Sequence, residues 1–325
     1  MIKTKSLLKG ALVAGAICVL PGMASAAMTG QCSVCHTMHD SQDGVSVTGQ
    51  AQPNAQLLIG DGCAGCHDVD ANDATGRGSF NAPQVGSGTS ASLNAGGYFS
   101  GTAVNQHDVS DLSAAADGNL GNVPPGGTDL GTQLTCAGTS GCHTSGGHHA
   151  NTGNDSATWL TGASVGGSFR FLDGVQGIED DDFENEAATD HNTYYGATSG
   201  NPVAGTMSNL CASCHTDFHS TANTQSGAGW IRHPTDLAMS ATYVGNYDTN
   251  SGGAASYNAA VPVATSTAGD NTIANNGTTD AIVMCLSCHR AHGSDQADLL
   301  RFDYSLNLAG PNGASPGCET CHGAK

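Results

Sequence analysis

The sequence predicts a fold of mostly loops and short α-helices, with very little β-structure, built around bound groups instead of a large apolar core. Leu, Ile, Val and Phe supply only 51 of the 325 residues, and glycine alone supplies 46. The apolar residues follow neither the helical nor the strand period over long stretches. So few apolar side chains do not bury enough surface to offset the entropy lost on ordering the chain. A short cysteine and histidine motif recurs along the whole length and indicates what replaces the core.

The motif is Cys-x-x-Cys-His, which occurs five times intact and once in a stretched form. The intact copies comprise Cys32, Cys35 and His36; Cys63, Cys66 and His67; Cys211, Cys214 and His215; Cys285, Cys288 and His289; and Cys318, Cys321 and His322. The stretched copy has five residues between its cysteines and comprises Cys136, Cys142 and His143. The pattern is the attachment site of a c-type haem, because the two thiols form thioethers to the porphyrin and the histidine binds the iron. We therefore predict six haem c groups and a multihaem cytochrome c fold, in which loops and short α-helices wrap around a chain of six haems.

Disulfide bonds and zinc sites also use paired cysteines. Disulfides form in the oxidising compartments that exported proteins enter, and zinc ribbons contain Cys-x-x-Cys pairs. Neither requires a histidine directly after every second cysteine, and all twelve cysteines after residue 26 belong to the six motifs. The stretched motif has alternatives of its own, a Cys136–Cys142 disulfide without haem or attachment through Cys142 alone. The histidine that follows favours attachment through both cysteines.

Residues 1–26 are predicted to be a secretion signal peptide. Three lysines precede an apolar run at 11–20, and Ala24-Ser25-Ala26 fits a cleavage site. The apolar run is too short to span a membrane, and no later segment is a transmembrane candidate. Residues 27–325 are expected to form a single six-haem domain. It is expected to be exported to the extracellular space or the outer cell surface, with the periplasm as the alternative.

The part of the chain after the signal peptide is strongly acidic. It has six basic residues against 28 acidic ones, a balance of −22. Nucleic acid is excluded as a partner, because a surface of this charge repels the phosphate backbone. Metal cations and positively charged mineral surfaces are compatible with it. The acidic run between Glu179 and Asp190 is either a solvated face or a cation site.

The chain has more histidines than the six that follow the cysteine pairs. The other eight are candidate distal ligands to the haem irons: His39, His107, His148, His149, His191, His219, His233 and His292. Iron held by two histidines has no open position for a substrate, so its chemistry is one-electron transfer. Methionine is the competing sixth ligand, and five are available: Met28, Met38, Met207, Met239 and Met284.

The position of a histidine relative to the motifs predicts which haem iron it would bind. A histidine three residues after a proximal one, as in His39 and His292, points away from that haem and is better placed for a neighbouring haem. Of the adjacent His148 and His149, one is expected not to be a ligand. His191 is either a ligand or a solvated histidine.

Four segments resemble the family of extracellular six-haem c-type cytochromes of the OmcS type, which come from metal-reducing bacteria. They are Cys-Ser-Val-Cys-His-Thr-Met-His at 32–39, Cys-Ala-Ser-Cys-His-Thr-Asp-Phe-His at 211–219, Arg-His-Pro at 232–234 and Cys-Leu-Ser-Cys-His-Arg-Ala-His at 285–292. The order of the motifs is similar along nearly the whole chain after the signal peptide. The resemblance implies subunits that polymerise into conductive extracellular filaments, with two histidines on every iron. It also implies that His39 binds a haem of the neighbouring subunit.

Three functions therefore compete. The favoured one is an extracellular electron conduit built as a filament, which would exchange electrons with other redox cytochromes and with metal oxides or electrodes. The second is a monomeric periplasmic or surface electron carrier. The third, a multihaem reductase with one open iron, is disfavoured because the histidine surplus leaves no iron short of a ligand. We expect an electron-transfer protein and not an enzyme.

Overall fold

The structure is a computed structural model. It describes residues 32–42, 44–46, 58, 62–67, 85, 96–97, 99, 105–112, 115–143, 148, 169, 171–172, 174–179, 191–198, 203–219, 233–250, 257–267, 281–306 and 317–323. The predicted signal peptide, His149 and the acidic run after Glu179 lie outside the described residues.

The helices are short. The α-helices are α1 (Ala64–His67), α3 (Met207–Ala212), α4 (Ala241–Asn250) and α5 (Glu319–His322). The 3-10 helices are η1 (Cys32–Val34), η2 (Ser110–Leu112), η3 (Thr216–His219), η4 (Cys285–Ser287), η5 (Ala297–Leu299) and η6 (Tyr304–Leu306). Only α4 has as many as ten residues among those described. The prediction of a loop-rich chain with short helices is confirmed.

The strands have two or three residues each. They are β1 (Ser41–Gln42), β2 (Val45–Ser46), β3 (Asn105–Gln106), β4 (Thr135–Ala137), β5 (Gly141–His143), β6 (Gly177–Ile178), β7 (Thr193–Tyr194), β8 (Leu237–Ala238), β9 (Ile282–Val283) and β10 (Gly293–Ser294). They form five two-stranded ladders, of which β1–β2, β3–β10, β6–β7 and β8–β9 are antiparallel. The β3–β10 and β8–β9 ladders join segments far apart in the sequence, so they tie the loops together locally and build no sheet layer.

Each intact motif forms a helical turn. The histidine amide donates to the carbonyl of the first cysteine in every case, at 2.8 Å in the first motif and 3.0 Å in the other four. This i to i+4 bond is the α-helical one. It gathers the two thiols and the histidine of the motif within one turn, as attachment to a single porphyrin requires.

The third motif departs from this expectation. Instead of a helical turn it forms β4 and β5, which pair in parallel with Thr135 opposite Gly141 and Ala137 opposite His143. A helical turn cannot close over five intervening residues, because its bond spans only four positions. The loop between the strands turns through Gly138, whose φ is +97° and whose carbonyl accepts from the Gly141 amide at 3.1 Å. This register sets Cys136 across from Cys142.

Two small apolar clusters lie in the second half of the chain. The first contains Phe169, Val175, Tyr194, Met207, Ala264, Ile282, Met284 and Leu286. The second contains Met239, Val244, Tyr247, Tyr257, Val261, Val263 and Ala281. The side chains of Tyr247 and Ile282 are fully buried. A protein core therefore supports the later motifs, which the low apolar content did not predict.

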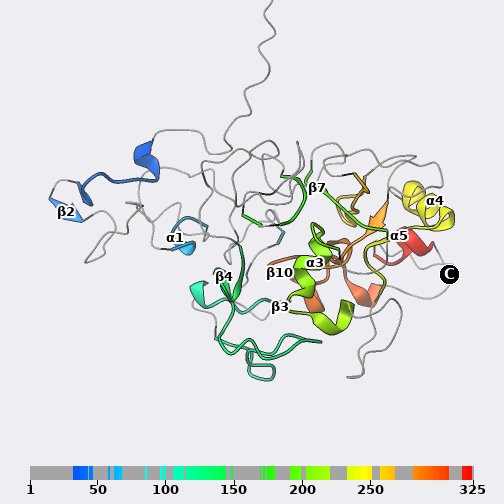
Figure 1. Cartoon of the computed structure of the whole chain (residues 1–325), viewed down its shortest axis with the longest axis horizontal. Coiled ribbons are helices and arrows are strands. Elements are labelled where there is room, and N and C mark those ends of the chain that lie inside the picture. Colours follow the sequence, from blue (N-terminus) through cyan, green and yellow to red (C-terminus); the bar gives the residue numbers. More distant parts are fainter. Residues whose placement is uncertain are drawn as a thin grey trace, which may run out of the picture.

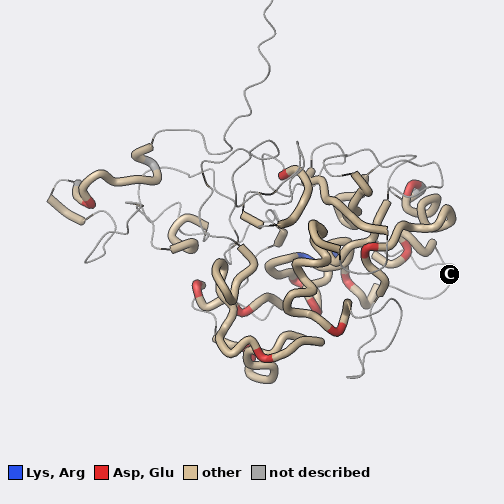
Figure 2. The backbone as a smooth tube through the Cα atoms, viewed as in Figure 1, with Lys and Arg blue, Asp and Glu red and all other residues tan. Residues whose placement is uncertain are grey.

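The described elements are spread along the long axis of the molecule, and β10, from late in the chain, lies beside β3 in the middle (Figure 1). The first motif and β2 lie at one end, α1 follows, and α4 and α5 lie at the other end, where α4 packs on α5. Acidic side chains are spread over the described part, whereas its basic side chains are confined to one region (Figure 2). Those are Arg290 and Arg301, on either side of β10. In the described part of the chain, no helix has the length and apolarity needed to cross a membrane.

Candidate haem-binding sites

Backbone carbonyls orient three of the six motif histidines. The Nδ1–H of His215 donates to the Pro125 carbonyl at 2.8 Å, and that of His289 donates to the Asp298 carbonyl at 2.7 Å. His143 is likewise hydrogen-bonded to the backbone of Phe171. A carbonyl that accepts a hydrogen bond from Nδ1–H fixes the tautomer and leaves Nε2 as the metal ligand.

Four proximal histidines face a second histidine from elsewhere in the chain. The ring centres of His67 and His148 are 6.2 Å apart, and those of His215 and His107 are also 6.2 Å apart. The distances are 6.0 Å for His143 with His292 and 6.0 Å for His322 with His233. Each pair joins one histidine of a motif to one of the candidate distal ligands.

These distances test whether an iron fits between the rings. A metal–imidazole bond is about 2.0 Å, and the nitrogen lies roughly 1 Å from the ring centre, so two axial imidazoles place their centres roughly 6 Å apart. All four pairs have this separation. His107 and His233 also donate Nδ1–H to the carbonyls of Ala291 and Pro234, at 2.8 and 3.0 Å. The donor set and spacing therefore fit two-histidine ligation of haem iron.

His39 and His289 share a different environment. Both rings are exposed. His289 donates its Nδ1–H to the Asp298 carbonyl at 2.7 Å and belongs to none of the four described pairs, although His107 lies within electrostatic range of it. His39 follows the first helical turn at the end of the molecule opposite α4. The structure thus leaves one proximal and one candidate distal histidine exposed and outside the four pairs.

The remaining candidates are buried or half-buried. The ring of His191 stacks on Tyr257, with centres 3.4 Å apart and planes 2° apart, and its Nδ1–H donates to the Asn192 carbonyl at 2.7 Å. His219 lies beside the fifth motif, with Nε2 3.8 Å from the Sγ of Cys285. His36 is half-buried, and its backbone bridges to Leu58.

The described methionines are core residues, with one exception. Met207 and Met284 belong to the first apolar cluster and Met239 to the second. Met38 is 81% exposed, and Met28 lies outside the described residues.

The cysteine sulfurs of consecutive motifs approach one another. The thiol of Cys63 is hydrogen-bonded to that of Cys136, and the thiol of Cys211 to that of Cys285. Three further pairs are close enough for the charge of one thiol to raise the pKa of the other: Cys35 with Cys66, Cys142 with Cys214, and Cys288 with Cys318. Two of these pairs are hydrogen-bonded and three lie within electrostatic range, and together they link all six motifs in sequence order. None of the twelve cysteines, all of which are described, is in a disulfide.

The paired thiols have displaced pKa values. A hydrogen bond from Cys136 lowers the pKa of the Cys63 thiol to about 7, whereas the same bond and burial raise that of Cys136. The hydrogen bond from Cys211 likewise lowers the pKa of Cys285. Since the thiolate is the nucleophile, one sulfur of each hydrogen-bonded pair, Cys63 or Cys285, is the more nucleophilic one before haem is attached.

Burial lowers the pKa values of two of the paired histidines. Desolvation is the largest cause for both His107 and His143. A lowered pKa keeps the imidazole neutral, which is the form that binds a metal.

A turn far from the fourth motif in the sequence contributes to its site, and the sequence did not predict it. The turn Pro124-Pro125-Gly126-Gly127 packs against the fourth motif. The Gly126 carbonyl accepts from the Asp217 amide at 2.7 Å, next to the Pro125 carbonyl that holds His215. The Pro-Pro-Gly-Gly sequence indicates a turn, but nothing in it indicates a contact with a motif 90 residues later.

The chain is 28% identical over 362 residues to the C-type cytochrome OmcS of Geobacter sulfurreducens, a match that covers 86% of this chain and 80% of the relative. No family model matches it. Two solved structures also align with it over 92% of each chain: OmcS nanowires from Geobacter sulfurreducens, at 23% identity and a TM-score of 0.49, and the Outer Membrane Cytochrome S filament from the same organism, at 22% and 0.48. The resemblance to an OmcS-type c-type cytochrome, predicted from the motifs, is confirmed.

Proposed function

We propose that the chain carries six c-type haems, each with two axial histidines, and conducts electrons as the subunit of an extracellular filament. The observation that carries the proposal is the separation of about 6 Å between four motif histidines and four other histidines. When bound, haem would supply one-electron chemistry through its iron, with no bond made or broken in a substrate. The chain's own part is to hold two imidazoles on each iron and to keep them neutral.

The contacts between cysteine sulfurs support a continuous path for electrons. Each sulfur would be joined to the edge of one porphyrin, so two sulfurs in contact bring two porphyrin edges together. Hydrogen-bonded sulfurs link the second motif to the third and the fourth to the fifth, and sulfurs within electrostatic range link the other consecutive motifs. The haems would then form one unbranched chain that follows the long axis seen in Figure 1.

Polymerisation is supported by the two exposed histidines that lie outside the four pairs. His289 would bind the fifth haem from one side, and it is not part of any of the four described histidine pairs. His39 lies in the exposed segment between the first motif and β1, and β2, which pairs with β1, lies at one end of the molecule (Figure 1). If His39 of one subunit binds the iron at His289 of the next, the contact is head-to-tail and does not close, which gives an open filament. The relative OmcS is itself described as forming nanowires, which agrees with this assembly.

The alternatives differ in what they require of the irons. A monomeric carrier would need a sixth ligand for the iron at His289 from within the same subunit. A reductase would need one iron open to a substrate and a cationic group beside it. The described cations are Arg290 and Arg301, and Arg301 donates to the backbone carbonyls of Leu286 and His289. It is therefore engaged in holding the fifth motif.

The test uses the secreted, haem-loaded protein. Mass spectrometry should find six haem additions, electron paramagnetic resonance should find low-spin iron only, and electron microscopy should show filaments. Five additions would refute attachment at the stretched motif. Six low-spin haems in particles of single-subunit size would favour the monomeric carrier. A stoichiometric high-spin signal in filaments would refute complete two-histidine ligation.

A further inference from the structure

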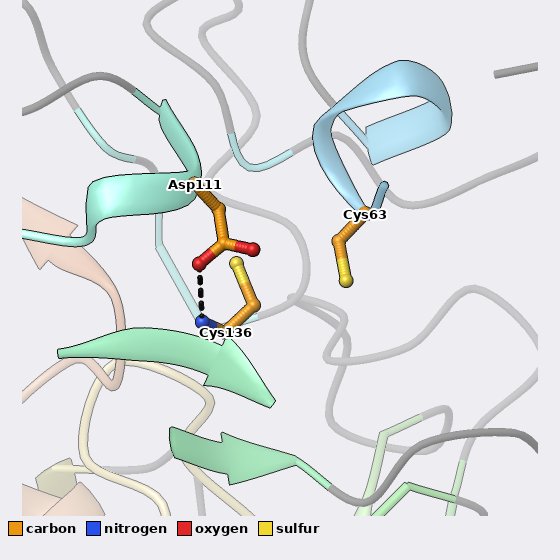
Figure 3. Close-up of side chains that lie close together, drawn as sticks. All are labelled: Cys63, Asp111 and Cys136. Atoms are coloured by element: carbon orange, nitrogen blue, oxygen red, sulfur yellow. Dashed lines mark hydrogen bonds between the residues drawn. The ribbon is translucent and has the colours of Figure 1, made fainter. Parts of the chain in front are cut away.

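Asp111 lies at the junction of the second and third motifs. One of its carboxylate oxygens, the Sγ of Cys63 and the Sγ of Cys136 are all within 4.8 Å of one another (Figure 3). The three residues come from separate segments: Asp111 from η2, Cys63 from the turn before α1, and Cys136 from β4. The carboxylate is thus shared between two attachment sites.

The backbone holds the carboxylate in this position. Its Oδ2 accepts from the Cys136 amide at 2.9 Å. The preceding residue, Ser110, donates its amide to the Leu134 carbonyl at 2.9 Å, which fixes η2 against the start of β4. Gln133 adds a bond from its Nε2 to the Asp108 carbonyl at 3.1 Å. Three hydrogen bonds therefore keep Asp111 beside the stretched motif.

The charge of Asp111 is not neutralised within the described part of the chain. The lysines and arginines described there are only Arg290 and Arg301, both next to the fifth motif, and Asp111 has no ion pair. Two thiolates and a carboxylate at this spacing form a set of metal ligands. Attachment to porphyrin turns both sulfurs into neutral thioethers, so the carboxylate remains as the charged member.

We infer that Asp111 tunes the reduction potentials of the second and third haems, by placing one negative charge against the edges of both. The inference rests on the proposed haem attachment at Cys63 and Cys136. Reduction adds one electron to the iron and removes one positive charge from the haem. A neighbouring anion therefore stabilises the ferric form relative to the ferrous form. The potentials of the second and third haems would therefore be lower than they would be without this charge.

The effect expected from this geometry is moderate, because solvent screens a carboxylate at the surface. Removing the charge should change the ratio of ferrous to ferric iron at a fixed potential by roughly three- to tenfold in each of the two haems. The upper figure corresponds to about 59 mV for a one-electron couple. The other four haems should change little, because screening weakens the interaction with distance.

The decisive variant is Asp111→Asn, which removes the charge and keeps an oxygen that accepts from the Cys136 amide. The matched control is Asp117→Asn, since Asp117 is also exposed and accepts backbone amides, those of Asn119 and Leu120, at 2.7 Å. Haems are first counted by mass spectrometry in the full, loaded protein. Spectroelectrochemical titration then measures the reduced fraction against applied potential.

The expected result is six haems in all three proteins and a positive shift of two of the six electron equivalents in Asp111→Asn only. A titration of Asp111→Asn that superimposes on the unmodified protein overturns the inference. So does an equal shift in Asp117→Asn, which would mean a response to net charge. Fewer than six haems in the unmodified protein would instead refute attachment, and with it the proposed function at these motifs.

Discussion

The Nδ1–H of His215 donates to the carbonyl of Pro125, 90 residues earlier in the chain, at 2.8 Å. The turn that supplies this carbonyl touches the fourth motif again at Gly127. A Cβ added to Gly127 would overlap the carbonyl oxygen of Cys214. The orientation of one proximal histidine therefore depends on the absence of a side chain at one glycine.

Gly127→Ala should displace the turn and loosen the hydrogen bond to His215. We expect one of the six haems to show an altered low-spin signal, and stability to fall by about 1–3 kcal/mol, as for other overpacking substitutions. Electron paramagnetic resonance and the melting temperature measure the two effects. Gly118→Ala is the control, because a Cβ at Gly118 meets nothing within 4 Å. Equal behaviour of the two variants would show that the turn does not position His215.

His292→Ala should leave one high-spin iron, and that iron should belong to the third motif and not to the adjacent fifth motif. The reason is the 6.0 Å separation of the His292 and His143 rings. The assignment is checked in a second background, Cys136→Ser with Cys142→Ser, which cannot attach the third haem. If the pairing is right, His292→Ala adds no high-spin signal there. A signal that persists would assign His292 to another iron.

His39→Ala should keep all six haems attached and shorten the filaments, because the first motif itself is untouched. It should also leave one high-spin iron per subunit, which we assign to His289. Haem count, spin state and the length distribution in electron micrographs are measured together. Long filaments with six low-spin irons would show that His39 is not the bridging ligand. Long filaments with one high-spin iron would mean that burial of apolar surface holds the subunits together.

Asp236 should make stability fall as pH rises between about 4 and 7. Its side chain is fully buried, Oδ2 accepts from the Thr206 hydroxyl at 3.1 Å, and burial raises the pKa of the carboxyl to about 6. The folded state then holds the proton more tightly than the unfolded state. The resulting stability is complete below pH 4 and is lost as pH passes 6.

Asp236→Asn mimics the protonated form and suits the φ of +51° at this position. At pH 4 it should melt at the same temperature as the unmodified protein. At pH 7 it should melt at a higher temperature, and its free energy of unfolding should be larger by about 1–2 kcal/mol. Asp303→Asn should instead melt at a lower temperature than the unmodified protein at pH 7, because hydrogen bonds from Ser305 lower the pKa of Asp303. Parallel melting curves for Asp236→Asn and the unmodified protein from pH 4 to 7 would contradict the prediction.

The sequence predicted the local structure of the motifs better than the structure between them. Cys-x-x-Cys-His implies a helical turn, and all five intact copies form one. The pairs of histidines could not be predicted, because partners such as His143 and His292 come from distant loops without a shared pattern. The apolar clusters were missed for a similar reason. Tyr247 from α4 meets Tyr257 and Val261 from a loop, which no helical or strand period relates.

The four histidine pairs have a topological consequence for a chain that carries the proposed irons. Each span between two paired histidines overlaps the next span along the chain. The four spans are 67–148, 107–215, 143–292 and 233–322. Every peptide bond between His67 and His322 lies inside at least one of them. A protease that cuts a single surface loop would therefore release no fragment until the axial bonds are broken. A protein exposed outside the cell would keep its shape and its electron path after being nicked.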